Sequence, residues 1–319
     1  MNGLRCITVT PHPALDLSTR TPRVEPAHKL RCQEVLRHPG GGGINVARVL
    51  HRFGMPVQAW ALLAGPAGAQ VQQLLVQEGL SLRNFPIEGD TRQSLSVIDD
   101  STGAEYRFVL PGPKVSAAQW DGLLDALAPA NPRGAKRPWV VASGSLPPGL
   151  AAQAYAQLAR RARAQGWRVA LDSSGAALTE ALTAGVDLVK PSLRELRQAT
   201  GMPLVTLAEQ SQAARALIAS GQTRAVALSL GEAGALLATP QGCWQQDAIP
   251  VAAGQGSTGA GDSFLAGLLW AWERGETDAQ ALGWASACGA AAVMAAGTGL
   301  ATPTSAHALH AQCPPVRTL

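Results

Sequence analysis

The chain has 319 residues, of which 46% are hydrophobic and 15% charged, so it can bury a large core and is not expected to be disordered. Its formal charge of +4 includes no run of five or more Lys or Arg, which argues against nucleic-acid binding. The five cysteines are widely spread without a C-x-x-C pair, so we expect no structural zinc and a reducing compartment. The first residues lack the apolar core of a signal peptide, so we expect a cytoplasmic protein.

The first fifty residues combine a short strand with a glycine run that leads into a helix. The β-branched residues 6–10 predict a strand, and Asp16 is expected in the loop after it. Residues 30–36 are expected to form an exposed or edge strand. A run of four glycines then precedes a helix over 44–50: Gly40, Gly41, Gly42 and Gly43. Ordering four glycines costs chain entropy, so we expect this backbone to approach a ligand; a flexible linker is the alternative.

A hairpin is predicted in the next part of the chain, after a buried strand over 57–63 and a helix over 68–78. Residues 93–99 alternate in polarity, and a Ser-Thr-Gly turn leads from them into 105–109. Together with 30–36, this hairpin would form a small separate sheet, a lid inserted from segments of about 16–38 and 91–111. A hairpin that simply packs on the domain is the alternative.

From Trp120 onward, helical and strand patterns alternate, as is typical of a parallel sheet. Four of the apolar runs lead to a polar residue: Ser143, Asp172, Lys190 and Ser229. Carboxyl ends of parallel strands meet at one edge of an open α/β sheet, where ligands bind, so these residues are expected on one rim. The sequence therefore predicts one α/β domain over 1–319. The Ala- and Gly-rich stretch 283–301 is expected to be a packed helix and loop, and no membrane span is expected.

The stretch 257–264 places glycines, one carboxylate and a helix start in succession. The first N–H groups of a helix lack internal partners, so the amides of Gly259, Ala260 and Gly261 are suited to an anion, with Asp262 beside it as a base. The alternative is an ordinary turn that connects a loop to a helix and binds no ligand. Residues 254–259 match G-x-G-x-x-G, but no early βαβ unit or following acidic residue supports a dinucleotide site, and no P-loop motif occurs.

Residues 39–50 and 259–264 resemble the two signature regions of the PfkB (ribokinase-like) family of carbohydrate kinases. Further similar segments follow in the same order along nearly the whole chain: 15–16, 29–31, 91–93, 105–112, 143–149, 172–175 and 189–191. The resemblance implies a three-layer α/β/α fold with a mostly parallel sheet and a small inserted β-sheet lid. Within the family, the pattern is most similar to the branch that phosphorylates fructose 6-phosphate.

Carried over residue by residue, the resemblance implies a site for two substrates. Asp262 would be the base that acts on the sugar hydroxyl, with the 259–261 amides as anion hole, and an ordinary pKa of ~3.9 would leave it ionised at neutral pH. Arg92, with Lys29, would hold the 6-phosphate. The remaining sugar contacts would be Asp16, the glycines 40–43, Asn45, Arg107 and Ser143. ATP would meet Lys190, Ser229, Gly231 and Gly234, and Glu195 would act on Mg²⁺ through water.

Two departures from the family pattern concern cations. Ser192 stands where the family usually has Asn in an N-x-x-E motif, so the polar group near Mg²⁺ is shorter. The loop 295–299 consists of Ala, Gly and Thr, where the most similar branch tends to have polar and basic side chains. In relatives this loop helps to hold a monovalent cation, so a role for K⁺ stays open.

The resulting expectation is a glycolytic kinase that uses ATP to convert fructose 6-phosphate to fructose 1,6-bisphosphate. A 1-phosphofructokinase or tagatose-6-phosphate kinase is the alternative within the family, and a non-catalytic sugar-phosphate sensor lies outside it. The four-glycine run and residues 105–112 favour the 6-phosphate. Because a small exposed sheet leaves unpaired edges, we also expect a homodimer through the lid, in which Lys29 or Arg31 reaches the neighbour's site.

Overall fold

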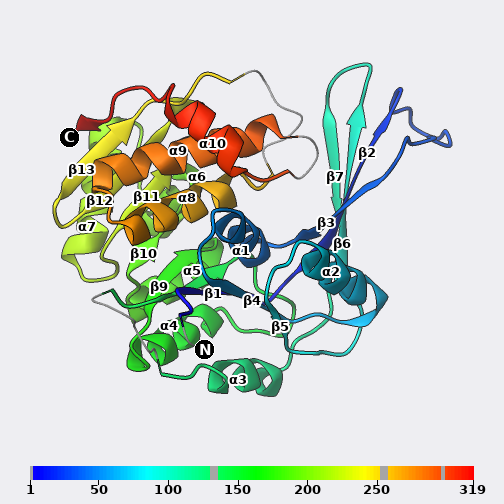
Figure 1. The fold of residues 1–319 in the computed structure, drawn as a ribbon, viewed down its shortest axis with the longest axis horizontal. Coiled ribbons are helices and arrows are strands. Elements are labelled where there is room, and N and C mark those ends of the chain that lie inside the picture. The colour runs from blue at the N-terminus through cyan, green and yellow to red at the C-terminus, as the bar shows by residue number, and fades with distance from the viewer. Residues whose placement is uncertain (1–2, 130–135, 252–257, 296–298) are drawn as a thin grey trace.

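A large twisted sheet forms the centre of the computed structural model, which describes residues 3–129, 136–251, 258–295 and 299–319 (Figure 1). Its ten strands among these residues follow the order β14-β13-β12-β11-β10-β9-β8-β1-β4-β5. The parallel strands are β1 (Cys6–Thr10), β4 (Val57–Ala61), β5 (Leu82–Asn84), β8 (Trp139–Ser143), β9 (Arg168–Asp172), β10 (Leu188–Val189) and β11 (Val226–Ser229). The antiparallel strands at one side are β12 (Ala235–Thr239), β13 (Gly242–Gln246) and β14 (Arg317–Thr318).

Helices cover both faces of this sheet. One face carries α1 (Gly42–Arg52), α2 (Gly65–Gln77), α8 (Ala260–Arg274), α9 (Asp278–Met294) and α10 (Pro303–His310). The other carries α3 (Ala117–Asp125), α4 (Ala154–Ala164), α5 (Gly175–Ala184), α6 (Leu193–Thr200) and α7 (Leu207–Ala219). Successive strand side chains enter opposite cores, as Val140 and Val141 do, because the side-chain period of a strand is two residues. Strands buried on both faces are therefore mostly apolar, as the sequence pattern indicated.

A second sheet of four strands projects from the side of the molecule that carries α2 (Figure 1). Its order is β3 (Leu36–Gly40), β2 (Ala14–Thr21), β6 (Arg92–Asp99) and β7 (Glu105–Val109). The central pair, β2 and β6, is parallel, whereas β3 and β7 pair antiparallel to their neighbours. Every residue of the edge strand β7 is exposed.

The expected fold class is confirmed, but two boundaries in the small sheet were predicted wrongly. Asp16 does not lie in a loop, because the chain re-enters a strand at Ala14 and this strand pairs on both sides. The strand placed at 30–36 begins only at Leu36, and 30–35 have no regular structure. Alternating polarity indicates an extended chain around Asp16 and over 30–36. Whether an extended chain becomes a strand depends on a pairing partner elsewhere in the sequence, so the strand limits could not be predicted from the alternation.

The apolar stretch near the C-terminus is a helix of the packed core. Residues 278–294 form α9, which packs between α8 and α10. In the part of the chain that the structure describes, none of the helices combines the length and the apolar character that crossing a membrane requires.

Candidate active site

The predicted rim of polar residues is present at one edge of the large sheet. Ser143 and Asp172 end the neighbouring strands β8 and β9 and pair directly across them. Lys190 follows β10, and Ser229 ends β11. The order β8-β9-β10-β11 puts these four strand ends side by side. The prediction that their side chains share one carboxyl edge is confirmed.

The N-terminus of α8 opens at this rim. Gly259 is the N-cap residue, with φ of 82°, and no side chain caps the helix start. A Cβ atom at Gly259 would lie 2.5 Å from the Leu300 side chain, so only glycine fits the turn. The first backbone N–H groups of α8 are thus left without a side-chain acceptor, and this arrangement suits an anion.

Asp262 lies in the first turn of α8, where two polar groups reach it from elsewhere in the chain. The Asn45 amide on α1 donates a 2.9 Å hydrogen bond to Oδ2 of Asp262. The Lys190 ammonium lies 3.2 Å from the Asp172 carboxylate, and a Cβ atom at Gly261 would be 3.1 Å from the same ammonium. Lys190 was predicted for the nucleotide, but the structure places it directly beside the anion-hole turn.

The pKa values of this cluster differ from those of free side chains. Burial raises the pKa of Asp262 to about 7, and the Asp172 charge adds to this, while the Asn45 hydrogen bond and Lys190 oppose it. Burial also raises the pKa of Asp172, against the Lys190 charge. For Lys190, burial alone would lower the pKa, but the charges of Asp172 and Asp262 outweigh it and raise the pKa. The raised pKa of Asp262 departs from the ordinary value expected from the sequence, because the carboxyl group loses hydration in the fold and the charges of Asp172 and Asp16 act on it.

Asp16 lies at the base of the small sheet, next to the glycine run. Gly40 must be glycine here, since a Cβ atom would lie 2.2 Å from an Asp16 carboxylate oxygen. Likewise, a Cβ atom at Gly42 would lie 2.2 Å from the Ser143 hydroxyl oxygen. The glycine run thus brings the α1 N-terminus, Asp16 of the small sheet and Ser143 of the large sheet together. Burial raises the pKa of Asp16 to about 6, although the charges of Arg107, Arg92 and Arg48 lower it.

Arg92 starts β6, which pairs with the strand that carries Asp16. Its Nη2 donates to the backbone carbonyl of His12 at 3.1 Å, and its Nε is buried without a partner. The His12 ring contacts the Ser145 hydroxyl at 3.1 Å, and a Cβ atom at Gly112 would lie 2.3 Å from its Nε2. Sequence reasoning missed His12. Its position between the first strand and Asp16, in Pro-His-Pro, was the available signal.

Arg107 and Lys29, the other two cationic residues predicted to contact the sugar phosphate, are more exposed than Arg92. Arg107 lies on the exposed strand β7, with Nε 3.9 Å from a Glu105 oxygen, and its charge acts on Asp16. Lys29 lies exposed between β2 and β3, and we find no contact between it and Arg92 among the described residues.

The residues predicted for the nucleotide lie near the same rim. Ser229 Oγ donates to the Pro191 carbonyl at 3.5 Å, and residues 231–233 form a 3-10 turn. Gly234 was expected to let the backbone approach phosphates. The structure gives another reason for it, because a Cβ atom there would lie 2.0 Å from the Gln246 carbonyl oxygen of β13.

Comparison with known proteins identifies the family. A family model described as "pfkB family carbohydrate kinase" matches residues 12–305. The chain belongs to the PfkB family of carbohydrate kinases. The predicted resemblance is thereby confirmed for most of the chain.

Several named PfkB kinases are similar over nearly their whole lengths. ATP-dependent 6-phosphofructokinase isozyme 2 of Mycobacterium tuberculosis is 41% identical over 92% of this chain and 85% of the relative. The Escherichia coli protein of the same name is 34% identical over 97% and 98%. A 1-phosphofructokinase of Xanthomonas campestris is 38% identical over 83% of each chain. A crystal structure of phosphofructokinase-2 from E. coli "in complex with substrates and products" superposes with a TM-score of 0.90, at 34% identity over 97% and 99%.

The magnesium ion that such a kinase implies was assigned to Glu195, and the structure gives this side chain a second role. Glu195 and Ser192 form a capping box at the start of α6: Ser192 N donates to Glu195 Oε2 at 2.8 Å, and Glu195 N donates to Ser192 Oγ at 3.3 Å. The S-x-x-E spacing signals this box, and sequence reasoning did not use it. Among the described residues no three His, Cys, Asp or Glu side chains gather around one point. This donor set fits a magnesium ion held mainly by phosphate and water, with at most one or two carboxylates.

Proposed function

We propose that this PfkB-family kinase transfers the γ-phosphoryl group of ATP to fructose 6-phosphate and forms fructose 1,6-bisphosphate. The observation that carries the proposal is the position of Asp262 in the first turn of α8, beside helix amides that no side chain caps. A base and an anion site in this arrangement are what transfer from a phosphate to an alcohol requires.

Asp262 would accept the proton of the attacking sugar hydroxyl, and its surroundings support that role. A general base works best when its pKa lies near the working pH, and the pKa of Asp262 is raised to about 7. The Asn45 amide orients the carboxylate through Oδ2, so that Oδ1 is available to the hydroxyl. The first amides of α8 and the Lys190 ammonium beside Gly261 would stabilise the charge on the transferring phosphoryl group.

The sugar phosphate would lie between the two sheets. Asp16 and the backbone at the glycine run would bind its hydroxyls. Arg92 would hold its 6-phosphate, since an arginine can donate two parallel hydrogen bonds to a phosphate group. Ser143 and Arg107 would complete the contacts. Lys29 remains part of the proposal only as a residue that a partner subunit supplies, because it lies exposed between β2 and β3.

ATP would occupy the rim on the side of β11, at Ser229 and the turn that contains Gly231 and Gly234. Its magnesium would neutralise the phosphates, with Glu195 acting through water. A structure of the E. coli relative is described as a complex with potassium. The loop expected to bear on K⁺ falls largely on 296–298, outside the described residues, as do residues 254–257 before the anion-hole turn.

The test offers purified protein with ATP and Mg²⁺ to a panel of ketohexose phosphates: fructose 6-phosphate, fructose 1-phosphate and tagatose 6-phosphate. ADP release is measured for each. We expect the highest kcat/KM for fructose 6-phosphate. Preference for fructose 1-phosphate would instead support the 1-phosphofructokinase alternative, which relatives of that name favour. Binding of a sugar phosphate without ADP release would support the sensor.

A further inference from the structure

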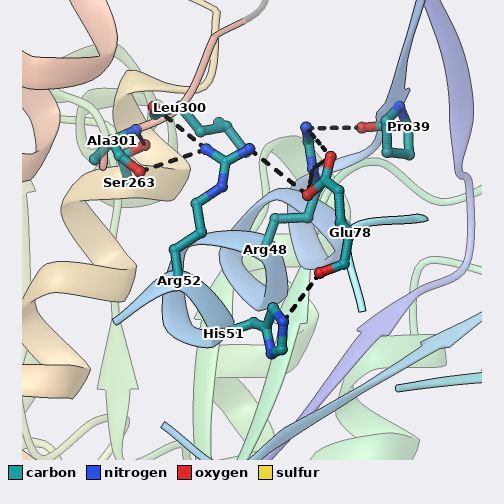
Figure 2. A network of polar contacts seen from close by, with 8 residues as sticks. All are labelled: Pro39, Arg48, His51, Arg52, Glu78, Ser263, Leu300 and Ala301. Carbon is teal, nitrogen blue, oxygen red and sulfur yellow. Dashed lines mark hydrogen bonds and ion pairs between the residues drawn. The ribbon is translucent and has the colours of Figure 1, made fainter. Parts of the chain in front are cut away.

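A network of ionic and polar contacts lies behind the active site and joins three helices, the strand β3 and the Leu300–Ala301 segment (Figure 2). At its centre, the Glu78 carboxylate next to the end of α2 binds two arginines of α1. Arg48 donates to it from Nε at 3.0 and 2.9 Å and from Nη2 at 2.5 Å. Arg52, one helical turn further along α1, lies with Nη2 3.6 Å from the other Glu78 oxygen. Glu78 therefore fixes both guanidinium groups relative to each other.

One branch of the network leads toward the anion-hole turn. Arg52 Nη1 donates to the backbone carbonyls of Leu300 and Ala301 at 3.4 and 3.5 Å (Figure 2). Ala301 N in turn donates to the Ser263 hydroxyl at 3.3 Å, and Ser263 is the fully buried neighbour of Asp262. The Leu300 side chain packs against Gly259, the N-cap of α8. Thus Arg52 holds the segment that supports both ends of the anion-hole turn.

The other branch leads toward the sugar side. Arg48 Nη1 donates to the Pro39 carbonyl at 3.2 Å, and Pro39 directly precedes Gly40, which packs on Asp16. Arg48 is only 3% exposed, and its charge acts on the pKa of Asp16. The network therefore spans the back of both halves of the site without touching the positions where a substrate would bind.

Stability alone is a weak explanation for these charges. The Arg48 side chain is buried, whereas the Arg52 and Glu78 side chains are each 28% exposed. Moving the Arg48 cation out of water costs free energy that its attraction to Glu78 only partly returns, and an apolar side chain of similar volume often serves a core equally well. A charged group that binds loop carbonyls, by contrast, fixes the position of a loop in a way that an apolar side chain does not.

We propose that Arg52 is a positioning residue of the phosphoryl-transfer centre: held by Glu78, it fixes the Leu300–Ala301 segment and through it the turn formed by Gly259–Ser263. The inference rests on the proposed function in one respect, since a phosphoryl transfer is what the test measures. A displacement of this turn by a fraction of an ångström would misalign the anion-hole amides and Asp262 with the reacting atoms.

The experiment compares Arg52→Ala and Arg52→Lys with Arg160→Ala, which removes an exposed arginine of α4 on the opposite face of the sheet. We expect Arg52→Ala to lower kcat by about tenfold or more, since small misplacements of reacting groups cost this much. The KM values for ATP and sugar phosphate should change less than about twofold, because Arg52 touches neither binding region. Arg52→Lys should lie between, since an ammonium keeps the charge but not the planar fork.

Two further readouts separate positioning from general stability. Millimolar guanidinium added to Arg52→Ala should restore part of kcat by binding the vacated carbonyls, and it should not raise the kcat of Arg160→Ala. Glu78→Gln should lower kcat and also raise the KM for the sugar phosphate, because Glu78 anchors both branches. An Arg52→Ala protein with unchanged kcat and a lower Tm would overturn the proposal. So would an unchanged kcat in Arg52→Lys if Arg52→Ala does not fold.

The assay uses whichever ketohexose phosphate the unmodified protein prefers. A preference for fructose 1-phosphate would therefore contradict the proposed substrate while leaving the Arg52 comparison valid. A normal preference for fructose 6-phosphate with no loss of kcat in the Arg52 variants would contradict only the positioning role.

Discussion

At the residue scale, the proposed chemistry depends on the Asp262 carboxyl group, whose surroundings disfavour its charged form. Desolvation in the fold raises the pKa of Asp262 to about 7, and the charges of Asp172 and Asp16 act in the same direction. Only the ionised form accepts a proton, which links the reaction rate directly to the titration of this group. The fold offsets the cost of burial with one amide from α1 and one ammonium from the end of β10.

This environment predicts the pH dependence of both rate and stability. The rate should rise with pH and level off above about pH 7, and Asp262→Asn should abolish turnover while sugar-phosphate binding persists. The folded pKa lies above the unfolded value, so proton binding stabilises the folded state at low pH, and this contribution is lost as pH rises through about 7.

Asp262→Asn should therefore raise Tm at pH 8, by about 2 °C or more, and should leave it unchanged near pH 3.5, where the carboxyl group is protonated in the folded state and largely so in the unfolded chain. Thermal unfolding of both proteins at the two pH values measures this difference. Retained turnover in the variant, or an equal Tm at pH 8, would contradict the role or the raised pKa of Asp262.

Sequence reasoning was more successful for residues whose position follows from local chain geometry. The rim residues could be placed because each follows a recognisable apolar run. Asp262 could be placed because the glycines before the next apolar run indicate the start of a helix. The raised pKa of Asp262 could not, since it depends on Asp172, Asp16 and Lys190, which meet only in the folded chain. His12 and the contact of Arg52 with Leu300 were missed for the same reason, because the partners lie 80 or more residues away in sequence.

At the element scale, the glycine run positions a helix rather than forming a flexible loop. Gly41 has φ of 108° and serves as the N-cap of α1, and its neighbours let Asp16 and Ser143 approach the backbone closely. Many of the helices and parallel strands were predictable from periodicity, whereas the short strand β5 and the antiparallel strands β12, β13 and β14 were not predicted. The limits of β3 were not predictable either, because a strand end is set by where its pairing stops, and the β2–β3 pairing ends with Ser18 opposite Leu36 although β2 itself continues to Thr21.

Gly42→Ala tests this close approach. Its Cβ would lie 2.2 Å from the Ser143 hydroxyl and 3.0 Å from Gly144 N, so we expect a loss of about 1–3 kcal/mol in the free energy of unfolding and a higher KM for the sugar phosphate. Gly122→Ala is the matched control, because a Cβ there meets open space within α3. It should stabilise the protein by about 0.5–1 kcal/mol and leave the kinetics unchanged. Denaturant unfolding and steady-state rates of both variants would decide, and a Gly42→Ala protein that behaves like the control would contradict the packing argument.

At the scale of the whole molecule, the small sheet carries a surface that a monomer leaves uncovered. Large apolar side chains on and around it are exposed: Leu30, Leu36, Tyr106, Phe108, Val109 and Leu110. The edge strand β7 also has unpaired backbone groups. We infer that a second copy of the chain covers this sheet, since a symmetric partner buries both features at once.

Phe108→Lys should therefore shift the protein from dimer to monomer. Phe108 is 54% exposed on β7, and a charge buried in the interface without a partner disfavours association. Light scattering at several concentrations measures the mass. Val205→Lys, a change at a 71% exposed position before α7, is the control and should leave the mass unchanged. A monomeric unmodified protein would contradict the inference.

The separation of the site between two sheets has a further consequence for how binding energy is used. Asp262 lies on α8, which covers the large sheet, whereas Arg92 and Asp16 belong to the small sheet. The glycine run between β3 and α1 connects the two halves, together with the packing of α2 against β2 and β3. In the proposed binding mode, a sugar phosphate bound by the small sheet at one end would bring the hydroxyl at its other end toward Asp262. The binding energy of the phosphate would thereby lower the barrier of the reaction at the other end of the sugar. A ketose without the phosphate should therefore show a lower kcat as well as a higher KM.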